Sequence, residues 1–405
     1  MRVGVHGFDG QRLKQARIAR GLYKNKLAEA VGVTPQVIGK YEDGSHNPSI
    51  EVVNKLSATL RFNQDFFTTP ARHSDVGLVF WRSRQSESKS AREKTEQRMG
   101  WAAELFEMFE EVAEFQTDLM PSVEYLHDFR FTTLDDVERL AMEVRTQLGF
   151  GTEPIRNMTL ALENIGIPVV FWDVESDKQD GFQWFSERLD RQFVGINTRN
   201  STACRVRFDL AHELAHILLH RAVEPSDARS PTGHKALEIQ ANYFAGAFLF
   251  PAESFYADVA YPSLDYFLSL KRKWGVSVSG MIERAFALDM IDKEERTDLH
   301  RKSSQRKWRG RGRQEPMDDE LVVDRPRLFR KAFELLLNEG LTSRSSIRYT
   351  LPIPDEEIEQ IIGLEPGELA QSFGENDKVR ILPVRSRSSS GAFGQSGEVL
   401  EFKKD

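Results

Sequence analysis

The sequence of 405 residues is almost free of cysteine. Cys204 is the only one, so no disulfide can form within the chain. A single cysteine is typical of proteins in a reducing compartment. Apolar runs are also short: residues 245–252 form one of the longest, whereas a transmembrane helix needs about 20 apolar residues. The first residues lack the apolar segment of a signal peptide. These absences predict a cytoplasmic protein that has no membrane partner.

An overall excess of positive charge is missing as well. Lys and Arg number 55 against 62 Asp and Glu, which gives a net charge of -7. This balance argues against a protein that is covered by nucleic acid over its whole surface. Residues 8–48 differ, because they hold 7 basic and 4 acidic side chains, a local charge of +3. A local excess of this kind suits contacts with DNA phosphates.

Turn residues and changes in polarity predict the organisation of the chain. Three short β-type runs, at 167–174, 181–186 and 192–197, lie between helical patterns and predict a mainly α fold with a small β-sheet, that is, an α+β fold. The predicted parts are a domain of four or five helices (8–67), a linker with a helical arm (68–130), an α+β domain (131–295), a basic hinge (296–317) and a small helical C-terminal module with a loose tail (318–405).

The N-terminal part has the pattern of a helix-turn-helix domain. Thr34 is placed to cap a helix in which Gln36, Gly39 and Lys40 lie on the face away from the apolar residues. Polar residues near the start of such a helix meet base edges in the major groove. We therefore expect Thr34, Gln36 and Lys40 to contact DNA. The apolar positions that would form the core are Leu13, Ala16, Leu27, Ala28, Val31, Val37, Ile38, Val52, Leu56 and Leu60.

This stretch resembles the Xre/Cro-type repressor domain. The matching segments are RLKQAR, GL, LAEAVGVTPQVIGKYEDG and NPS. The resemblance implies double-stranded operator DNA as the partner and a homodimer on a pseudo-palindromic site. The family usually has Gln at the start of its second helix, where this chain has Lys24, so Lys24 is a further candidate contact that would shift DNA preference. The alternative is a helical module that only mediates interactions or dimerises.

A second motif lies at residues 208–220, FDLAHELAHILLH, and contains His212-Glu213-x-x-His216. In a helix, His212 and His216 lie about 40° apart on one face. Leu210 and Leu214 fall on the opposite face, so the helix can pack through leucines and present both imidazoles together. This arrangement is typical of a zinc site.

Zinc with two histidines needs a third protein ligand and an open position for water. Glu238 is the candidate, because it opens the helical pattern ALEIQANYFAGAFLF, whose alanines allow close approach to the histidine helix. Glu213 lies beside the metal face and is the candidate catalytic base, since a carboxylate there can take a proton from zinc-bound water. The implied reaction is hydrolysis of a peptide bond.

Other interpretations of the same residues stay open. The histidines can form a surface pair without metal, or a structural or sensory zinc site without turnover. His220 continues the stripe but fits a place behind the ligands better than a place among them. Asp209 can orient an imidazole or be a solvated charge. Cys204 is more typical of inert core than of a ligand.

Residues from about 150 to 291 resemble the ImmA/IrrE family of zinc metallopeptidases. The matching segments are NMTLALENIGIPVV, DGF, VGIN, RFDLAHELAHILLH, LEIQANYFAGAFLFP and LKRKWGVSVSGMIERAFALDMI. The family pattern implies Zn²⁺ ligands at His212, His216 and Glu238 and a base at Glu213. The chain departs from it at Asp209, usually Thr or Ser, and at Ala215, often Gly.

The resemblance implies a regulator that relieves repression by cleaving an Xre-type repressor, in trans or in its own linker. In several fused members the peptidase-like domain senses rather than cuts, so a non-enzymatic sensor is the alternative. A component of a toxin–antitoxin or phage-defence system is another. The WRSR segment at 81–84 is expected to be an exposed linker open to proteolysis. Trp308, within the basic hinge, can touch DNA or lie in a solvated linker.

Overall fold

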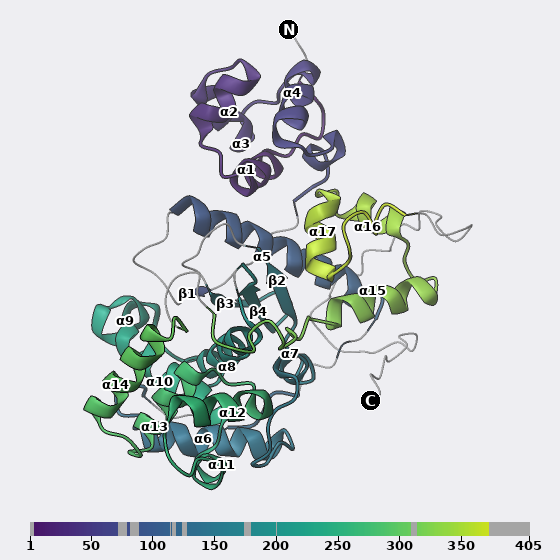
Figure 1. Ribbon diagram of the computed structural model, residues 1–405. Coiled ribbons are helices and arrows are strands. Elements are labelled where there is room, and N and C mark those ends of the chain that lie inside the picture. Colours follow the sequence, from purple (N-terminus) through teal and green to yellow (C-terminus); the bar gives the residue numbers. More distant parts are fainter. Residues whose placement is uncertain are drawn as a thin grey trace.

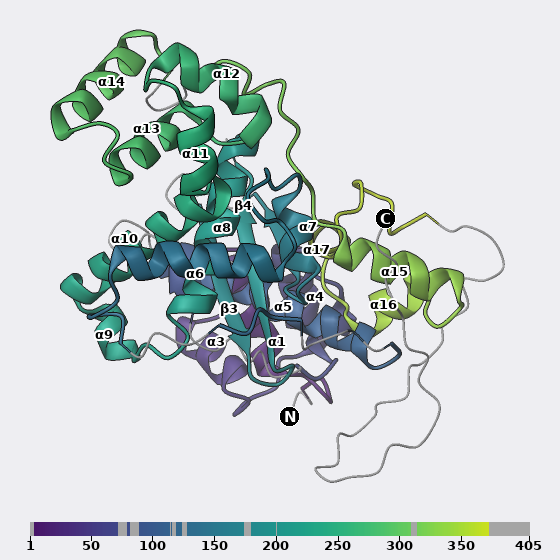
Figure 2. The same cartoon turned by 90° about the horizontal axis from the view of Figure 1, so that it is seen from below.

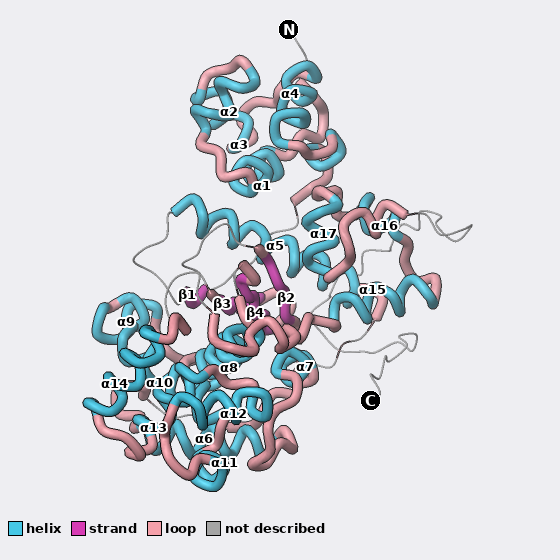
Figure 3. The backbone as a smooth tube through the Cα atoms, in the orientation of Figure 1, coloured by secondary structure: helices cyan, strands magenta, loops and turns pink. Residues whose placement is uncertain are grey.

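The computed structural model describes residues 4–71, 79–81, 89–113, 115, 119–123, 128–173, 180–199, 201–308 and 314–371. Helices dominate, and one small sheet lies among them (Figure 3). The expected α+β class is therefore confirmed. None of the described helices combines the length and apolar character needed to cross a bilayer.

The N-terminal helices end where the sequence places turn residues. Gly32 follows the second helix with φ +76°, a conformation that side chains with a Cβ rarely adopt. Thr34 accepts a hydrogen bond from the backbone N–H of Val37 and so caps the third helix. The elements are α1 (Gly10–Ala19), α2 (Lys24–Val31), α3 (Pro35–Glu42), α4 (Ile50–Leu60) and the 3₁₀ turn η1 (Gln64–Phe67).

The sheet has the strand order β1-β3-β4-β2. β3 (Gly181–Ser186) pairs antiparallel with β1 (Val79–Trp81) and with β4 (Arg191–Asn197), and β2 (Val169–Trp172) pairs parallel with β4. The three β-type runs of the sequence thus form β2, β3 and β4. β1 comes from the segment in which the sequence predicts a linker, so the linker prediction was wrong at this place.

The rest of that segment is also more ordered than its polarity indicates. Helix α5 (Lys89–Glu110) begins about three turns before the apolar stretch that starts at Trp101. Its polar first half was expected to be linker, because exposed helix faces and linkers have the same composition. Of the WRSR segment at 81–84, Trp81 ends β1 and the other three residues lie outside the described part of the chain.

The sheet separates two apolar cores. On one face, residues such as Val169, Val194 and Ile196 pack with α6, α8 and α10. On the other face, Trp172 and Phe182 belong to a core that also includes α5, the N-terminal helices and the C-terminal module. Gly195 is needed here, because a Cβ would lie 2.1 Å from the Phe182 ring. Figure 1 shows the sheet between α5 and α8, and Figure 2 shows the same layers from below.

The helices on this side of the sheet include α8, which carries the two histidines of the metal-binding pattern (Figure 1). Their bounds are α6 (Leu134–Gln147), α7 (Met158–Glu163), α8 (Ala203–Leu219), α9 (Pro225–Arg229), α10 (Pro231–Leu249), α11 (Ala252–Asp258), α12 (Leu264–Trp274) and α13 (Val278–Ala287).

The predicted basic hinge is largely folded. Helix α14 (Lys293–Gln305) covers its first part, and Trp308 packs against the core around α8 and α10. That packing contradicts a fully solvated place for Trp308. Lys271, buried in α12, binds Glu315 and Asp318 at 3.0 and 2.6 Å and so anchors the end of the hinge. Residues 309–313 lie outside the described part.

The C-terminal module consists of α15 (Leu328–Asn338), α16 (Arg344–Thr350) and α17 (Asp355–Ile362). Its apolar residues join the core that α5 shares with the N-terminal helices. Glu357 of α17 binds Arg98 of α5 at 2.9 Å and lies 3.9 Å from Arg20, the residue that follows α1. The module therefore helps to hold the N-terminal domain on α5. The tail from residue 372, expected to be loose, lies outside the described residues.

Glu163, at the end of α7, joins the α+β domain to this module. Its carboxylate accepts hydrogen bonds from the backbone N–H groups of Arg327 and Leu328, both at 2.9 Å. Burial raises its pKa from 4.5 to about 7, although the two N–H groups act to lower it. The folded protein thus holds the Glu163 proton to higher pH than the unfolded chain does.

We expect Glu163 to stabilise the folded protein fully below about pH 4.5. As the pH rises to about 7, the free energy of unfolding should fall by about 3 kcal/mol, because the carboxyl then ionises in the unfolded chain first. Replacing Glu163 with Gln should remove this pH dependence. Denaturant unfolding of both proteins across the window measures it, with the exposed Glu339→Gln as the control. Equal pH slopes in wild type and Glu163→Gln would contradict the expectation.

Candidate metal centre

Helix α8 presents the histidines from inside the domain. Thr202 caps it by accepting a hydrogen bond from the backbone N–H of Arg205. Leu210 and Leu214 are fully buried in the core, as their helical spacing indicates. His212 and His216 are buried as well, with relative exposures of 0% and 4%. A buried pair excludes the alternative of surface histidines.

Helix α10 brings the third side chain. It begins at Pro231, capped by Ser230, so Glu238 lies two turns inside the helix and does not open it, contrary to the sequence prediction. Ala241 and Ala245 are fully buried. Their small side chains allow α10 to pack closely on α8, as expected.

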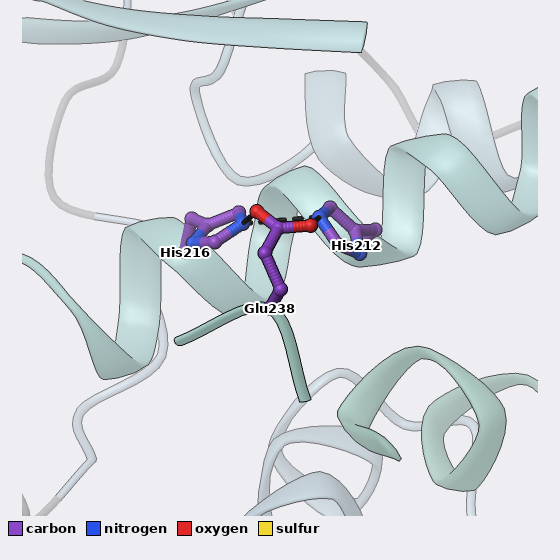
Figure 4. A group of neighbouring side chains, drawn as sticks. All are labelled: His212, His216 and Glu238. Carbon is purple, nitrogen blue, oxygen red and sulfur yellow. Dashed lines mark hydrogen bonds and ion pairs between the residues drawn. The ribbon is translucent and has the colours of Figure 1, made fainter. Parts of the chain in front are cut away.

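The three predicted ligands meet at one point. Atoms of His212, His216 and Glu238 that can bind a metal all lie within 4.8 Å of one another. Figure 4 shows the Glu238 carboxylate between the two imidazole rings. The Nε2 atoms of the histidines are 3.0 Å apart, and the carboxylate oxygens lie 3.5 Å from His216 Nε2 and 3.7 Å from His212 Nε2.

These distances fit zinc. Two ligands at roughly 2.0–2.1 Å from a tetrahedral ion lie about 3.4 Å apart, and the three measured separations lie on both sides of that value. Two neutral imidazoles and one carboxylate are also a donor set that zinc prefers. The exposed fraction of the Glu238 side chain, 21%, leaves a route from solvent.

Glu213 lies next to this cluster, on α8, and is buried. Its neighbour across the structure is Gly181, the first residue of β3. A Cβ at position 181 would lie 2.8 Å from Glu213 Oε1, so only glycine leaves the carboxylate in its place. The DGF segment gives no sign of this contact, since nothing local connects positions 181 and 213.

His220 contacts the far side of His216. Its Nδ1 lies 2.8 Å from His216 Nδ1, and its Nε2 lies 3.1 Å from Gln240 Oε1. His220 is thus behind a ligand, and it does not belong to the three-residue cluster. Burial lowers its pKa well below the usual value, and the neighbouring His216 acts in the same direction. No local pattern indicates a role for Gln240, because its contact with His220 joins α10 to the end of α8.

The two remaining candidates have no place in the cluster. Asp209 is buried and accepts a hydrogen bond from Arg205 Nε at 3.1 Å, which excludes a solvated charge. Cys204 is buried too, and burial raises the pKa of its thiol to about 12. The thiol therefore stays protonated at neutral pH, as expected of inert core.

The candidate DNA contacts lie on α2 and α3. Thr34, Gln36 and Lys40 are exposed, although the Thr34 hydroxyl already serves as a helix cap. Lys24 is half exposed, and its ammonium group binds Glu42 at 3.1 Å. Glu42 also binds Arg17 at 2.5 Å. In Figure 1, α1 lies between α5 and the helices α2 and α3.

Comparisons with known proteins match both regions. Residues 13–63 match the helix-turn-helix family model, and residues 162–286 match the model of the IrrE N-terminal-like domain, peptidase family M78. An HTH-type transcriptional regulator derived from the SPbeta prophage of Bacillus subtilis is 39% identical over 57 residues, 14% of this chain and 53% of the relative. An HTH-type regulator of Rickettsia prowazekii is 33% identical over 63 residues, 16% and 48% of the two chains.

The chain thus spans about half the length of these curated relatives. A solved Mycobacterium tuberculosis transcriptional regulator is 22% identical, with 37% of this chain and 46% of the regulator covered and a TM-score of 0.29. The two family matches confirm the resemblances. The chain contains an Xre-type helix-turn-helix domain and, after it, an IrrE/ImmA-type domain of a family of zinc metallopeptidases.

Proposed function

We propose that this protein is a transcriptional regulator that binds operator DNA as a homodimer and carries a zinc-dependent peptidase, which cleaves a repressor and so relieves repression. The observation that carries the proposal is the meeting of His212, His216 and Glu238 in a chain that also contains a helix-turn-helix domain. The peptidase requires the ion in this cluster, with Glu213 beside it.

The residues divide the chemistry among them. His212, His216 and Glu238 would hold Zn²⁺, which when bound lowers the pKa of its water to about 7 and polarises a carbonyl. Glu213 takes the proton of the attacking water and delivers it to the leaving amine. Gly181 keeps the Glu213 carboxylate in position, because its missing Cβ leaves the space that the carboxylate occupies.

The position of β1 supports cleavage within the chain's own linker. An extended peptide can add to a sheet through main-chain hydrogen bonds. β1 does so on β3, and its last residue, Trp81, pairs with Phe182, the neighbour of Gly181. The chain that follows the DNA-binding domain is therefore held at the edge of the sheet nearest to Glu213. A repressor cleaved in trans would compete with β1 for this edge.

The test is cleavage by zinc-loaded protein. We expect wild-type protein, incubated alone or with an Xre-type repressor, to give fragments in intact-mass spectrometry, and Glu213→Gln to give none while it keeps its zinc. Identical behaviour of the two proteins, each loaded with zinc, toward every repressor offered and toward itself would refute the peptidase. Ligand-dependent release of DNA without fragments would favour the sensor.

A non-enzymatic sensor is supported by a separate observation. The N-terminal domain packs on α5 through the buried pair Arg12–Glu104, and α5 shares a core with the sheet that covers α8. In the described part of the chain, only the sheet therefore separates α8, which carries the histidines of the metal centre, from α5, on which the DNA-binding domain packs. In this alternative the ion or a bound peptide shifts DNA affinity without hydrolysis.

DNA binding is tested at α3. The operator is first selected from random duplexes. We expect Gln36→Ala to lower the discrimination between bases at one operator position by about 1–3 kcal/mol. Lys40→Ala should weaken binding to every duplex to a similar extent, and the slope of log affinity against log salt concentration should become smaller by about one. Lys24→Ala should have less effect than Lys40→Ala, since Glu42 already pairs with Lys24. The matched control is Lys293→Ala, an exposed lysine of α14. Unchanged binding by both α3 variants would contradict the assignment of α3.

Replacing Gly181 with Ala is expected to lower hydrolysis about 100-fold, because a displacement of about 1 Å at a catalytic group has an effect of this size. Zinc content should be unchanged, since the added Cβ meets Glu213 and not a ligand. Cleavage rate and zinc analysis measure the two effects. The control is Gly246→Ala, whose Cβ would make only ordinary contact, 3.8 Å from Arg284. Full activity of Gly181→Ala would show that the contact has no catalytic consequence.

A further inference from the structure

A line of hydrogen bonds leads from a surface loop to the metal centre. The carbonyls of Phe129 and Thr132 contact Gln240 Nε2 at 2.7 and 3.2 Å. Gln240 Oε1 contacts His220 Nε2 at 3.1 Å, and His220 Nδ1 contacts His216 Nδ1 at 2.8 Å. Gln240, His220 and His216 are all buried. The Gln240 amide and each neutral imidazole have one donor side and one acceptor side, so the direction of one bond decides the next.

The direction is set at Gln240. Backbone carbonyls only accept hydrogen bonds, so the side-chain group that faces two of them must be the NH₂ of the amide. The opposite orientation would bring the amide oxygen against two carbonyl oxygens in a buried place, which is unfavourable. The Gln240 Oε1 atom must therefore face His220, where it can only accept.

The two histidines follow from this orientation. Because Oε1 accepts, His220 must donate from Nε2, and a neutral imidazole that carries its proton on Nε2 has a lone pair on Nδ1. His216 Nδ1, 2.8 Å away, must then donate to that lone pair. A neutral His216 with its proton on Nδ1 has its lone pair on Nε2, the atom that faces Glu238 at 3.5 Å.

We infer that Gln240 and His220 are positioning residues that set the tautomer of His216, so that its Nε2 lone pair is presented to the metal before any metal binds. The inference deepens the proposed function, since it concerns the same centre. It assigns a role to the third histidine of the HELAHILLH stretch, which is not a ligand, and to the loop that supplies the carbonyls of Phe129 and Thr132.

The tautomer gives a test that needs no hydrolysis. In metal-free wild-type protein, ¹⁵N–¹H correlation spectra of the imidazoles should show His216 protonated on Nδ1 and His220 on Nε2. In His220→Phe, which keeps a ring but loses the acceptor, His216 should no longer be held as the Nδ1–H tautomer. His220→Asn offers an amide oxygen near the place of Nδ1 and should restore it.

Zinc affinity gives the second readout, by competition with a chromogenic chelator. We expect His220→Phe and Gln240→Leu to bind zinc about 10–100-fold more weakly than wild type, the usual cost of losing a partner behind a ligand. His220→Asn should recover most of the loss. His300→Phe, the same change at a histidine that binds Glu283, is the matched control and should bind zinc normally.

The inference is overturned if metal-free wild type holds His216 protonated on Nε2. It is also overturned if His220→Phe keeps both the tautomer and the zinc affinity of wild type, or if His220→Asn is as weak as His220→Phe while both are folded by circular dichroism. A wild type that binds zinc and sets the tautomer but never cleaves a peptide would refute the proposed peptidase and leave this inference intact.

Discussion

Replacing Glu238 with Ala is expected to reduce bound zinc from one equivalent to a small fraction of one. The carboxylate lies 3.5 and 3.7 Å from the two histidine nitrogens and is the only acidic member of the described cluster. Two imidazoles alone leave the ion with half of a tetrahedral site, whereas zinc sites in proteins use at least three protein ligands. Elemental analysis of purified protein, after dialysis against a weak chelator, measures the loss.

The matched control is Glu213→Gln, which changes a carboxylate on the neighbouring helix and should keep the full zinc content. If both variants retain zinc, Glu238 is not a ligand. If both lose it, Glu213 belongs to the metal site and not to proton transfer. Only loss in Glu238→Ala together with retention in Glu213→Gln agrees with the roles assigned to the two residues.

Replacing Arg12 with Met is expected to lower the free energy of unfolding by about 3–5 kcal/mol, the usual cost of leaving one charge of a buried pair without its partner. Arg12 is fully buried and binds Glu104 at 3.3 Å. It also donates hydrogen bonds to the backbone carbonyls of Thr69 and Pro70. Glu104 is itself almost fully buried in α5, so its charge would remain away from water.

Denaturant unfolding measures this cost, and Lys26→Met is the control. Lys26 forms an ion pair with Glu29 in which both side chains are mostly exposed, and such pairs contribute about 0–1 kcal/mol. The double variant Arg12→Met, Glu104→Leu should recover part of the loss, because apolar residues can replace a buried pair. An Arg12→Met protein as stable as Lys26→Met would show that the pair does not hold the N-terminal domain on α5.

The elements that were predicted well have patterns within a few residues of sequence. The runs at 181–186 and 192–197 became β3 and β4 because the β-type residues of each strand are consecutive in the sequence and a turn separates the two runs. His212 and His216 could be paired because one helical turn separates them. Glu238 was found by helical spacing and by the family pattern, although the start of its helix at Pro231 was missed.

The elements that were missed depend on partners far away in the chain. β1 was assigned to a linker, because three residues carry almost no periodic pattern and become a strand only when β3 supplies hydrogen bonds. The first half of α5 was also assigned to a linker, since a polar helix is stabilised by packing more than by its own propensity. Trp308 packs against a core formed by distant segments, which no local pattern around it indicates.

The sequence by itself determined that His212 and His216 share one face of a helix and that the polar residues of α3 share another, because helical spacing is local. Only the tertiary structure decided what surrounds them. Gly181 meets Glu213 and Gln240 meets His220 through contacts between separate elements. Arg12 reaches Glu104 across 92 positions. These contacts depend on how the helices pack on the two faces of the sheet, and local periodicity carries no information about that packing.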